Sequence, residues 1–388
     1  MRVDALNGRA RALTVELPHG PLRTPVFMPV GTQGTIKGLT TAELQLPPLD
    51  CDIILGNTYH LGNRPGGDPL ERLGGLHEFM RWPRNILTDS GGFQMVSLLA
   101  LAEITEEGVT FASPVDGSKM LLTPEQSIQL QNQIGSDIMM ALDDVVDSKT
   151  VDDERFKEAC YRTLRWIDRC ISAHGRPTEQ NLFGIVQGGL DVSPGGLRDI
   201  CLEGMIKRDA NLPGYAIGGL AGGEEKEAFW QVVNHCTARL PPAKPLYLMG
   251  VGYPLDIVVC SALGVDMYDC VYPTRTARFG TALVHSGLLK LKHTSMATDM
   301  SPLDSTCSCY VCKTYTRSYL HLLAKTDSNA PQLLSYHNVA YMMRLVREMR
   351  AAIQAGQYAD YVRAFVANMF PVAEEVPSWV VRACEAAG

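Results

Sequence analysis

The sequence has no hydrophobic run long enough to cross a membrane. A spanning helix needs about 18 or more consecutive apolar residues, and polar or charged side chains interrupt every apolar stretch of this chain before that length. The first 20 residues contain Arg, Asp, Asn and Glu, which break the apolar core that a secretory signal requires. We therefore expect a soluble intracellular protein without membrane insertion, cytoplasmic by default, with the nucleus and the mitochondrial surface left open.

The chain also lacks an excess of positive charge and the cysteine pattern of a disulfide-stabilised protein. Its formal net charge of −7 argues against a non-specific nucleic-acid coat, because phosphate binding needs clustered Lys and Arg. The 11 cysteines are an odd number, and most stand singly inside apolar segments, as reduced thiols of a reducing compartment do. Long internal repeats and low-complexity tracts are absent as well. These absences leave a globular intracellular protein.

The chain does have enough apolar residues for a large core, and two patterns alternate along it. Hydrophobic residues make up 46% of the 388 residues, enough for one large α/β barrel or for two ordinary domains. Short strand-like apolar runs alternate with amphipathic segments of helical length, which predicts a parallel sheet. The runs lie at 51–57, 85–92, 136–144, 181–189, 214–220, 245–252 and 265–270, and the main amphipathic segments at 123–135, 152–174, 195–208, 224–240 and 254–264.

We predict an α/β fold of the (β/α)8 (TIM) barrel type, with a doubly wound open sheet as the alternative. The apolar runs suit strands buried on both faces, and they recur about every 30 to 50 residues, as barrel units do. Residues 10–17 and 24–30 flank the turn sequence at 18–21. They predict a β-hairpin that closes the barrel floor.

A polar or glycine residue ends each of the strand-like runs. In a barrel the carboxyl ends of all strands meet at one rim, where active sites lie. A single acid at a strand end is most often the N-cap of the next helix, but several acid and amide side chains at one rim predict a functional site. The residues concerned are Asn57, Asp89, Asp143, Gln187, Gly218, Gly219, Gly250 and Asp269.

A metal-binding pattern follows the last strand-like run. Cys307, Cys309 and Cys312 form C-x-C-x-x-C, and His337 follows later in the chain. Three thiolates and one imidazole suit tetrahedral Zn²⁺, and four protein ligands would make the site structural. Three chance surface cysteines and a redox dithiol are the alternatives, and His321 is the competing fourth ligand.

The region around this pattern is basic although the whole chain is acidic. Between Thr274 and Lys325 there are seven basic and two acidic side chains, an excess of five positive charges, which fits a polyanionic partner. We expect the barrel with its hairpin at residues 1–285, a zinc-binding subdomain at 286–345, and C-terminal helices that complete the barrel at 346–388.

Five motifs together resemble the tRNA-guanine transglycosylases. They are TDSGGFQ at 88–94, FGIVQGG at 183–189, YAIGGLAGGE at 215–224, MYDCVYPTRTAR at 267–278, and CSCYVC at 307–312 with its distant histidine. The resemblance covers nearly the whole chain in the same order, which makes it specific. The family is a zinc-containing (β/α)8 barrel that exchanges a guanine of tRNA for a 7-deazaguanine, so the resemblance agrees with the architecture predicted from the residues.

The resemblance implies covalent catalysis by two carboxylates. Asp269 matches the nucleophile that attacks the ribose C1′ and displaces guanine. Asp89 matches the acid/base that protonates the departing guanine and deprotonates the incoming base. Two inversions at C1′ then retain the β-configuration, as in retaining glycosidases.

The resemblance also implies a base site and an RNA contact. Asp143 matches the acid that reads the N1–H and N2–H₂ donors of guanine. The other residues matched to the base are Gln187 with the backbone of Gly218, Gly219 and Leu220 around O6 and the C7 substituent, and Phe93 and Met249 on the two base faces, where core packing is the alternative. Arg275 and Arg278 match contacts to the anticodon loop, with salt-bridged rim positions as the alternative.

Three positions depart from the bacterial pattern of this family and match the eukaryotic one. Phe93 replaces a tyrosine, Val145 a cysteine and Gly222 a valine. The missing side chain at Gly222 opens space for the substituent on C7 of the incoming base, so we predict the bulky base queuine as the substrate. The eukaryotic pattern implies a heterodimer with a homologous non-catalytic subunit, with a homodimer left open, and residues 310–325 are the candidate interface.

The predicted reaction is the exchange of guanine for queuine at the wobble position of tRNAs with GUN anticodons. Three alternatives stay open at this point. They are a non-catalytic tRNA-binding subunit, which we would expect to lack Asp269, an archaeal-type enzyme with a further C-terminal RNA-binding module, and a TIM-barrel glycosidase of small substrates.

Overall fold

The computed structural model describes residues 1–92, 103–112, 117–150, 152–326 and 329–388. Its centre is a sheet of eight parallel strands in the order β4-β14-β13-β12-β11-β10-β6-β5. A parallel bridge between Val30 and Leu55 joins the two ends, so the sheet is the predicted (β/α)8 barrel, nearly closed, and not the open sheet. The strands are β4 (Val26–Pro29), β5 (Ile53–Asn57), β6 (Asn85–Asp89), β10 (Ile138–Met140), β11 (Asn181–Val186), β12 (Gly214–Ile217), β13 (Leu246–Leu248) and β14 (Met267–Cys270).

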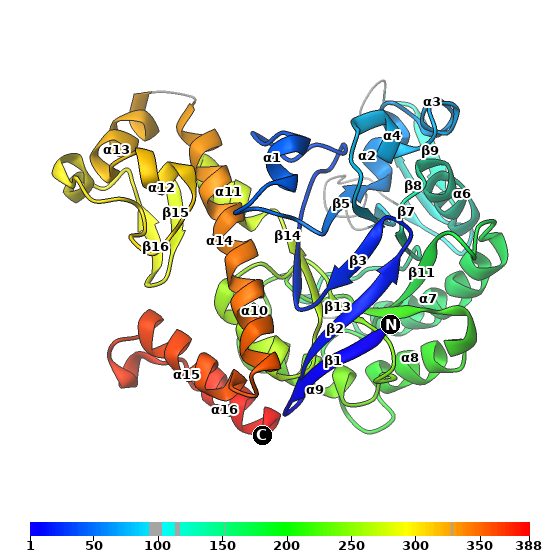
Figure 1. Cartoon of the computed structure of the whole chain (residues 1–388). Coiled ribbons are helices and arrows are strands. Elements are labelled where there is room, and N and C mark those ends of the chain that lie inside the picture. Colours follow the sequence, from blue (N-terminus) through cyan, green and yellow to red (C-terminus); the bar gives the residue numbers. More distant parts are fainter. Residues whose placement is uncertain (93–102, 113–116, 151, 327–328) are drawn as a thin grey trace.

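Helices cover the outside of the barrel (Figure 1). Each barrel strand is followed by at least one helix before the next strand of the barrel, which is the alternation that the sequence predicted. None of the helices in the described ranges is long and apolar enough to span a membrane. The helices of the barrel are α1 (Thr41–Gln45), α2 (Thr58–Asn63), α3 (Gly67–Arg72), α4 (Leu76–Met80), α6 (Pro124–Ile134), α7 (Asp153–Ala173), α8 (Leu197–Ile206), α9 (Lys226–Thr237), α10 (Pro254–Ala262) and α11 (Tyr272–Arg278).

The N-terminal strands differ from the prediction in one arm. β1 (Arg2–Asn7), β2 (Ala10–Leu17) and β3 (Gly20–Arg23) form a separate antiparallel sheet. The predicted second arm at 24–30 was wrong, because β3 pairs with β2 and the next strand, β4, pairs in parallel with β14. All four residues of β4 are buried, as expected for a strand inside a parallel barrel sheet.

The observed hairpin of β2 and β3, whose second arm differs from the predicted one, covers the floor of the barrel. Val15, Leu17 and Leu22 belong to the cluster of buried side chains that fills the barrel interior. Polar residues at the amino ends of the barrel strands bind the hairpin. The contacts join Arg11 to Asp266, Arg23 to Asp52, His19 to Asp137, and the Asn85 amide to the Gly20 carbonyl.

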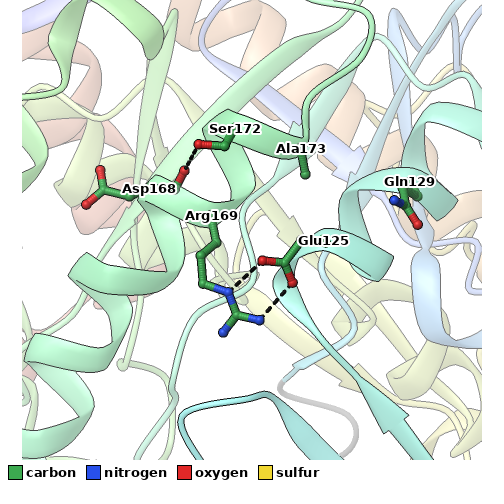
Figure 2. Close-up of a pocket in the computed structure, with 6 residues that line it drawn as sticks. All are labelled: Glu125, Gln129, Asp168, Arg169, Ser172 and Ala173. Atoms are coloured by element: carbon green, nitrogen blue, oxygen red, sulfur yellow. Dashed lines mark hydrogen bonds and ion pairs between the residues drawn. The ribbon is translucent and has the colours of Figure 1, made fainter.

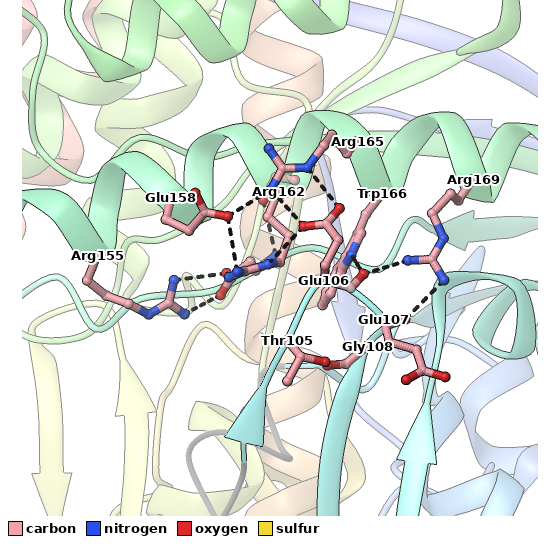
Figure 3. Close-up of polar contacts among 12 residues, drawn as sticks. Thr105, Glu106, Glu107, Gly108, Arg155, Glu158, Arg162, Arg165, Trp166 and Arg169 are labelled. Atoms are coloured by element: carbon pink, nitrogen blue, oxygen red, sulfur yellow. Dashed lines mark hydrogen bonds and ion pairs between the residues drawn. The ribbon is translucent and has the colours of Figure 1, made fainter.

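A small sheet between β6 and α6 lies against helix α7. It consists of β7 (Glu103–Ile104), β8 (Val109–Ala112) and β9 (Lys119–Leu122). Figure 3 shows how α7 holds the turn between β7 and β8: Arg165 binds the Glu106 carboxylate, and Arg169 and the Trp166 indole donate to the Glu106 carbonyl. The helix that follows β10 is thereby tied to an insertion that follows β6.

A subdomain beside the barrel follows α11. It contains β15 (Thr281–Val284), β16 (Gly287–Lys290), α12 (Tyr310–Thr314) and α13 (Arg317–Thr326), drawn yellow to orange in Figure 1. Helix α14 (Asn329–Gln354) then packs against the barrel, and α15 (Tyr358–Met369) and α16 (Ser378–Ala387) end the chain. The domain boundaries at 285 and 345 stay a prediction, and α14 runs without a break across the second.

Candidate functional site

The polar strand ends gather at the rim opposite the hairpin. Asn57 and Asp89 are the last residues of β5 and β6 and are partners in the parallel register. Asp143, Gln187, Gly218 and Gly250 come within three residues after β10, β11, β12 and β13, and Asp269 lies in β14. Because all eight strands are parallel, these residues face one end of the barrel.

Asp269 is held by two donors from the neighbouring strand. The Tyr247 hydroxyl and the Gly250 N–H each donate to its Oδ1 atom at 2.6 Å. Burial raises the pKa of this carboxyl, and the two hydrogen bonds oppose that shift. The carboxylate is therefore fixed in position, and its charged form is costly to maintain. Both properties are typical of carboxylates that take part in catalysis.

Asp89 is oriented by Asn57 and faces the same region. The Asn57 amide donates to both carboxylate oxygens at 2.9 Å, and the Gly91 N–H donates to Oδ1 at 2.9 Å. The charges of Asp269 and Asp89 both raise the pKa of the Tyr247 phenol, after burial as the main cause. Both predicted carboxylates therefore lie at the carboxyl ends of parallel strands, at the same rim of the barrel.

Asp143 and Gln187 form a buried pair. The Gln187 amide donates to the Asp143 carboxylate at 2.6 Å, and both side chains are buried. Burial raises the pKa of Asp143 to about 7, with the charge of Asp144 adding to the shift and the Gln187 hydrogen bond opposing it. Asp144 itself is fully buried in ion pairs with Arg155 and Arg162 of α7, two arginines drawn in Figure 3.

The glycines after β12 allow close approach to this pair. A Cβ at Gly218 would lie 2.8 Å from the Gln187 amide nitrogen, and one at Gly219 would lie 2.4 Å from the amide oxygen. Gly219 also has φ +70, which favours glycine. Leu220 is half-buried, and Met249 packs against the barrel interior.

Gly222 lies opposite a serine that the sequence did not indicate. A Cβ there would lie 2.6 Å from the Ser148 hydroxyl. That hydroxyl donates to Glu224, whose carboxylate also accepts from the N–H groups of Ala221 and Gly222. The space beside Gly222 is therefore bounded by Ser148 in this structure.

The two predicted arginines lie outside this group of strand ends. Arg275 and Arg278 are exposed on α11, the helix that begins two residues after β14. The charge of Arg275 opposes the rise that burial causes in the pKa of Cys270, next to Asp269. Phe93 lies outside the described residues.

The four predicted metal ligands lie together. The thiol sulfurs of Cys307, Cys309 and Cys312 lie 3.9, 3.5 and 3.3 Å from Nδ1 of His337. Zn–S and Zn–N bonds at a tetrahedral angle would separate such atoms by about 3.6 Å. Nε2 of His337 donates to the Leu283 carbonyl at 2.8 Å, which leaves the Nδ1 lone pair for a metal. These residues form a group that can hold one metal ion.

His321, the competing ligand, lies elsewhere. Its Nδ1 faces the Leu291 carbonyl at 2.6 Å, and it is not part of the Cys₃His group. The structure therefore favours His337 as the fourth ligand.

A second cluster of possible ligands, His19, His77 and Asp137, has the geometry of a hydrogen-bonded latch. The two imidazole rings are stacked with centroids 3.6 Å apart and planes 12° apart. A metal ion bound to imidazole lies in the ring plane, so one ion cannot satisfy two nearly parallel rings. Each ring instead faces a different oxygen of Asp137, at 2.7 and 3.1 Å. The latch ties the hairpin turn to α4 and to the barrel floor.

A surface groove of about 400 Å³ lies in the outer helical layer of the fold and not at the strand ends. It is lined by residues of α6 and α7, and the Arg169–Glu125 ion pair spans it, as Figure 2 shows. Both helices belong to the outer layer, and the groove contains none of the predicted site residues. The candidate site is therefore the rim cluster and not this groove.

Sequence reasoning named Asn57 and Gln187 at the rim but missed Tyr247, the side-chain partner of Asp269. Tyr247 was counted only within the apolar run at 245–252, and nothing in that run separates a tyrosine that points into the barrel from one that points outward. Ser148 follows the run at 136–144, in a segment without a recognisable pattern.

Comparison with known proteins gives one consistent family. The family model described as queuine tRNA-ribosyltransferase matches residues 5–371. A Schizosaccharomyces pombe protein described as a queuine tRNA-ribosyltransferase catalytic subunit is 53% identical over 383 residues, or 97% of this chain and 93% of the relative. A Caenorhabditis elegans protein of the same description is 50% identical over 382 residues, with 97% and 93% covered. A Thermus thermophilus queuine tRNA-ribosyltransferase is 47% identical over 388 residues, with 100% and 98% covered. A parallel barrel with acids at its rim, a Cys₃His group and these matches lead to one conclusion: the chain belongs to the queuine tRNA-ribosyltransferase family.

Proposed function

We propose that this chain replaces guanine with queuine at the wobble position of tRNAs with GUN anticodons, through a covalent bond between Asp269 and the ribose. One observation carries the proposal above the others. Asp269, bound by Tyr247, and Asp89, bound by Asn57, stand at the ends of parallel strands at one barrel rim, in the same ring of strand ends as the Asp143–Gln187 pair. A nucleophile, an acid/base and a reader of a purine edge are the three functions that base exchange requires.

In the first step, a carboxylate oxygen of Asp269 attacks C1′ of the target nucleotide. The C1′–N9 bond breaks, its electron pair stays on guanine N9, and Asp89 supplies the proton that makes guanine a neutral leaving group. Tyr247 and Gly250 both donate to Oδ1, so we assign Oδ2 to the new bond. These donors also make the carboxylate a better leaving group for the second step.

In the second step, the incoming base displaces Asp269 from the ribose and regenerates the free carboxylate. Asp89 takes the N9 proton of the base, and N9 then attacks C1′ and releases Asp269. Two inversions at C1′ give overall retention, as in retaining glycosidases. No redox partner is needed, because one glycosidic bond is exchanged for another.

Asp143 would read the base before and after exchange. As a carboxylate it accepts from both N1–H and the exocyclic amine of a guanine-like edge. Gln187 already donates to Asp143, and its second amide hydrogen can donate to O6. Gly218 and Gly219 let the Leu220 segment approach the other side of the base, and Phe93 and Met249 are the residues we assign to its faces.

Queuine as the incoming base rests on the environment of Gly222. A valine there would collide with Ser148 and push the two segments apart, so we assign to the glycine the role of keeping this wall in a position that admits a bulky substituent on C7. Gly222→Val should lower kcat/KM for queuine about 10- to 100-fold relative to that for a 7-aminomethyl analogue. Gly175→Val, in an exposed loop without a positive φ, is the matched control. Equal rates with both bases, unchanged in Gly222→Val, would contradict this assignment.

The metal and the partner complete the proposal. We assign Zn²⁺ to the Cys₃His group, where it would join the loop of Cys307–Cys312 to helix α14 and so support the subdomain. Arg275 and Arg278, exposed on the helix that follows the strand of Asp269, are assigned to the anticodon loop. We also propose a cytoplasmic heterodimer with a homologous non-catalytic subunit, supported by relatives described as catalytic subunits. Exposed Tyr310, Tyr319 and Leu322 make residues 310–325 its candidate interface.

Exchange of labelled guanine tests this function. The chain, alone and with a candidate partner subunit, is incubated with tRNA carrying labelled guanine and then with queuine. We expect label to leave a GUN-type tRNA and not to leave guanosine alone, since a glycosidase of small substrates would release it from the nucleoside. Failure to exchange with or without the partner would favour a binding subunit instead.

A further inference from the structure

Arg198 is a fully buried arginine whose guanidinium binds only backbone carbonyls among the described residues. It is the second residue of α8 and 0% exposed. Nε donates to the Gly189 carbonyl at 2.7 Å, Nη1 to Val186 at 2.8 Å and Nη2 to Gly218 at 2.8 Å. A planar fork of donors can reach three acceptors at fixed angles, which a lysine cannot do.

These three carbonyls belong to the loops that carry the proposed base-binding groups. Val186 and Gly189 bracket Gln187, whose amide binds Asp143, and Gly218 begins the glycine pair after β12. The Val186 carbonyl also accepts from the Gly218 N–H, so the two loops share one oxygen. Arg198 therefore fixes the distance between the loop of Gln187 and the loop of Gly218.

The contact around Gly219 shows how little freedom this arrangement has. A Cβ at Gly219 would lie 2.4 Å from the Gln187 amide oxygen and 3.4 Å from Nη2 of Arg198. The backbone after β12 thus approaches both side chains at the same point. The backbone at Gly188 also lies close to the start of α8, where a Cβ would lie 2.7 Å from the backbone nitrogen of Arg198.

The charge of Arg198 has no acidic partner in the described part of the chain. No ion pair includes it, and burying an unpaired guanidinium costs free energy that three carbonyl bonds only partly offset. Arg208, two residues after the end of the same helix, offers the contrast. It also donates to two carbonyls, those of Gly204 and Leu164, but it is ion-paired with Asp168.

We propose that Arg198 is a positioning residue of base exchange: it holds Gln187 and the Gly218–Gly219 backbone at the spacing that binds the purine edge. The inference rests on the proposed function of the rim. It assigns to Arg198 a role in affinity for the base and none in contact with the tRNA, because all its contacts lie on the loops behind the base site.

Steady-state exchange by Arg198→Lys tests the proposal, with Arg208→Lys as the matched control. Lysine keeps the charge and removes the fork. We expect the KM for guanine to rise about 10-fold or more, as for a loss of positioning, while the KM for tRNA stays within about 2-fold. Arg208→Lys should leave both constants at the wild-type values. If Arg198→Lys does not fold, Arg198→Gln takes its place, since it keeps two donors.

Two outcomes would overturn the proposal. One is an unchanged KM for guanine in the folded variant. The other is a parallel rise of both KM values with a loss of thermal stability, which would make Arg198 a purely structural residue. Calorimetric titration with guanine alone separates this result from a failure of the proposed function. If wild type binds guanine but exchanges none, the function is wrong, and the loss of guanine affinity in Arg198→Lys still decides the role of Arg198.

Discussion

Both ends of the barrel carry buried or half-buried acids, but their partners differ. At the floor, Asp137 faces His19 and His77, and Asp266 binds Arg11. At the rim, Asp143 is bound by the Gln187 amide, and Asp269 by a phenol and a backbone N–H, and within the described residues neither has an ion pair. The floor acids join segments of the chain, whereas the two rim acids remain available to bind or react with a ligand.

The pKa values follow this difference in part. Burial acts to raise the pKa of Asp137, but His77, His19 and the Ile86 N–H outweigh it and the net shift is downward. Burial dominates at Asp143 and Asp269, whose pKa values are raised. Asp266 is the exception, because its burial outweighs even Arg11 and gives a pKa of about 6. A cationic partner alone therefore does not distinguish the two ends, and their functions must be separated by substitution.

The largest effect is expected at Asp143. Asp143→Asn replaces one acceptor oxygen with a donor, so kcat/KM for guanine should fall about 10³-fold. The pKa of Asp143 is raised in the folded protein, so its protonated carboxyl contributes to folding stability at low pH. This contribution is lost as pH rises from about 4 toward 7. The variant should therefore be as stable as wild type, or more stable, at pH 8. Guanine exchange and a thermal melt measure the two, and a destabilised variant would place Asp143 with the floor acids.

Asp137 should show the opposite behaviour. Asp137→Asn removes the carboxylate that accepts from two imidazoles and two N–H groups, so unfolding should become easier by about 3 kcal/mol. The pKa of Asp137 is lowered, so its contribution exists above about pH 4 and disappears as pH falls through the folded value. Denaturant unfolding at pH 7.5 measures the loss. Exchange per folded molecule should be unchanged, and a matching loss of turnover would contradict a purely structural floor.

The affinity for guanine should depend on pH in a way that reports Asp143. The carboxylate form accepts the two donors of guanine, and its pKa is about 7. Below pH 7 the dissociation constant should rise about 10-fold for each pH unit, and above pH 8 it should be flat. Calorimetry between pH 5.5 and 8.5 measures this profile. A constant affinity over that range would mean that Asp143 is ionised throughout.

The smallest effect is expected from a paired test of two tyrosines. Tyr247→Phe removes a donor to Asp269, which should lower exchange about 5-fold and more at low pH, because the carboxyl pKa rises further. Tyr268→Phe is the control, since its hydroxyl binds Ser261 in the outer core. Equal losses in both variants would show that the phenol of Tyr247 serves packing only.

The barrel and the rim acids followed from the sequence for a simple reason. Parallel strands end at one rim, so a strand-like run that ends in Asp89 or Asp269 locates its acid without further knowledge of the fold. The eighth strand, β4, was assigned to the hairpin because three apolar residues between two prolines fit either place, and only pairing with β14 decides. Tyr247, the partner of Asp269, was out of reach for the same reason. Tyr247 and Tyr268 stand in similar apolar runs, and their opposite directions depend on strand register.

The most direct test of the account is to trap the covalent intermediate. Wild type, Asp269→Asn and Asp266→Asn are incubated at low temperature with a labelled anticodon stem-loop, quenched, and separated on a denaturing gel. We expect a protein–RNA band in wild type and in Asp266→Asn, whose acid lies three residues earlier at the floor, and no band in Asp269→Asn. A band that persists in Asp269→Asn would contradict the assignment of Asp269 as the nucleophile.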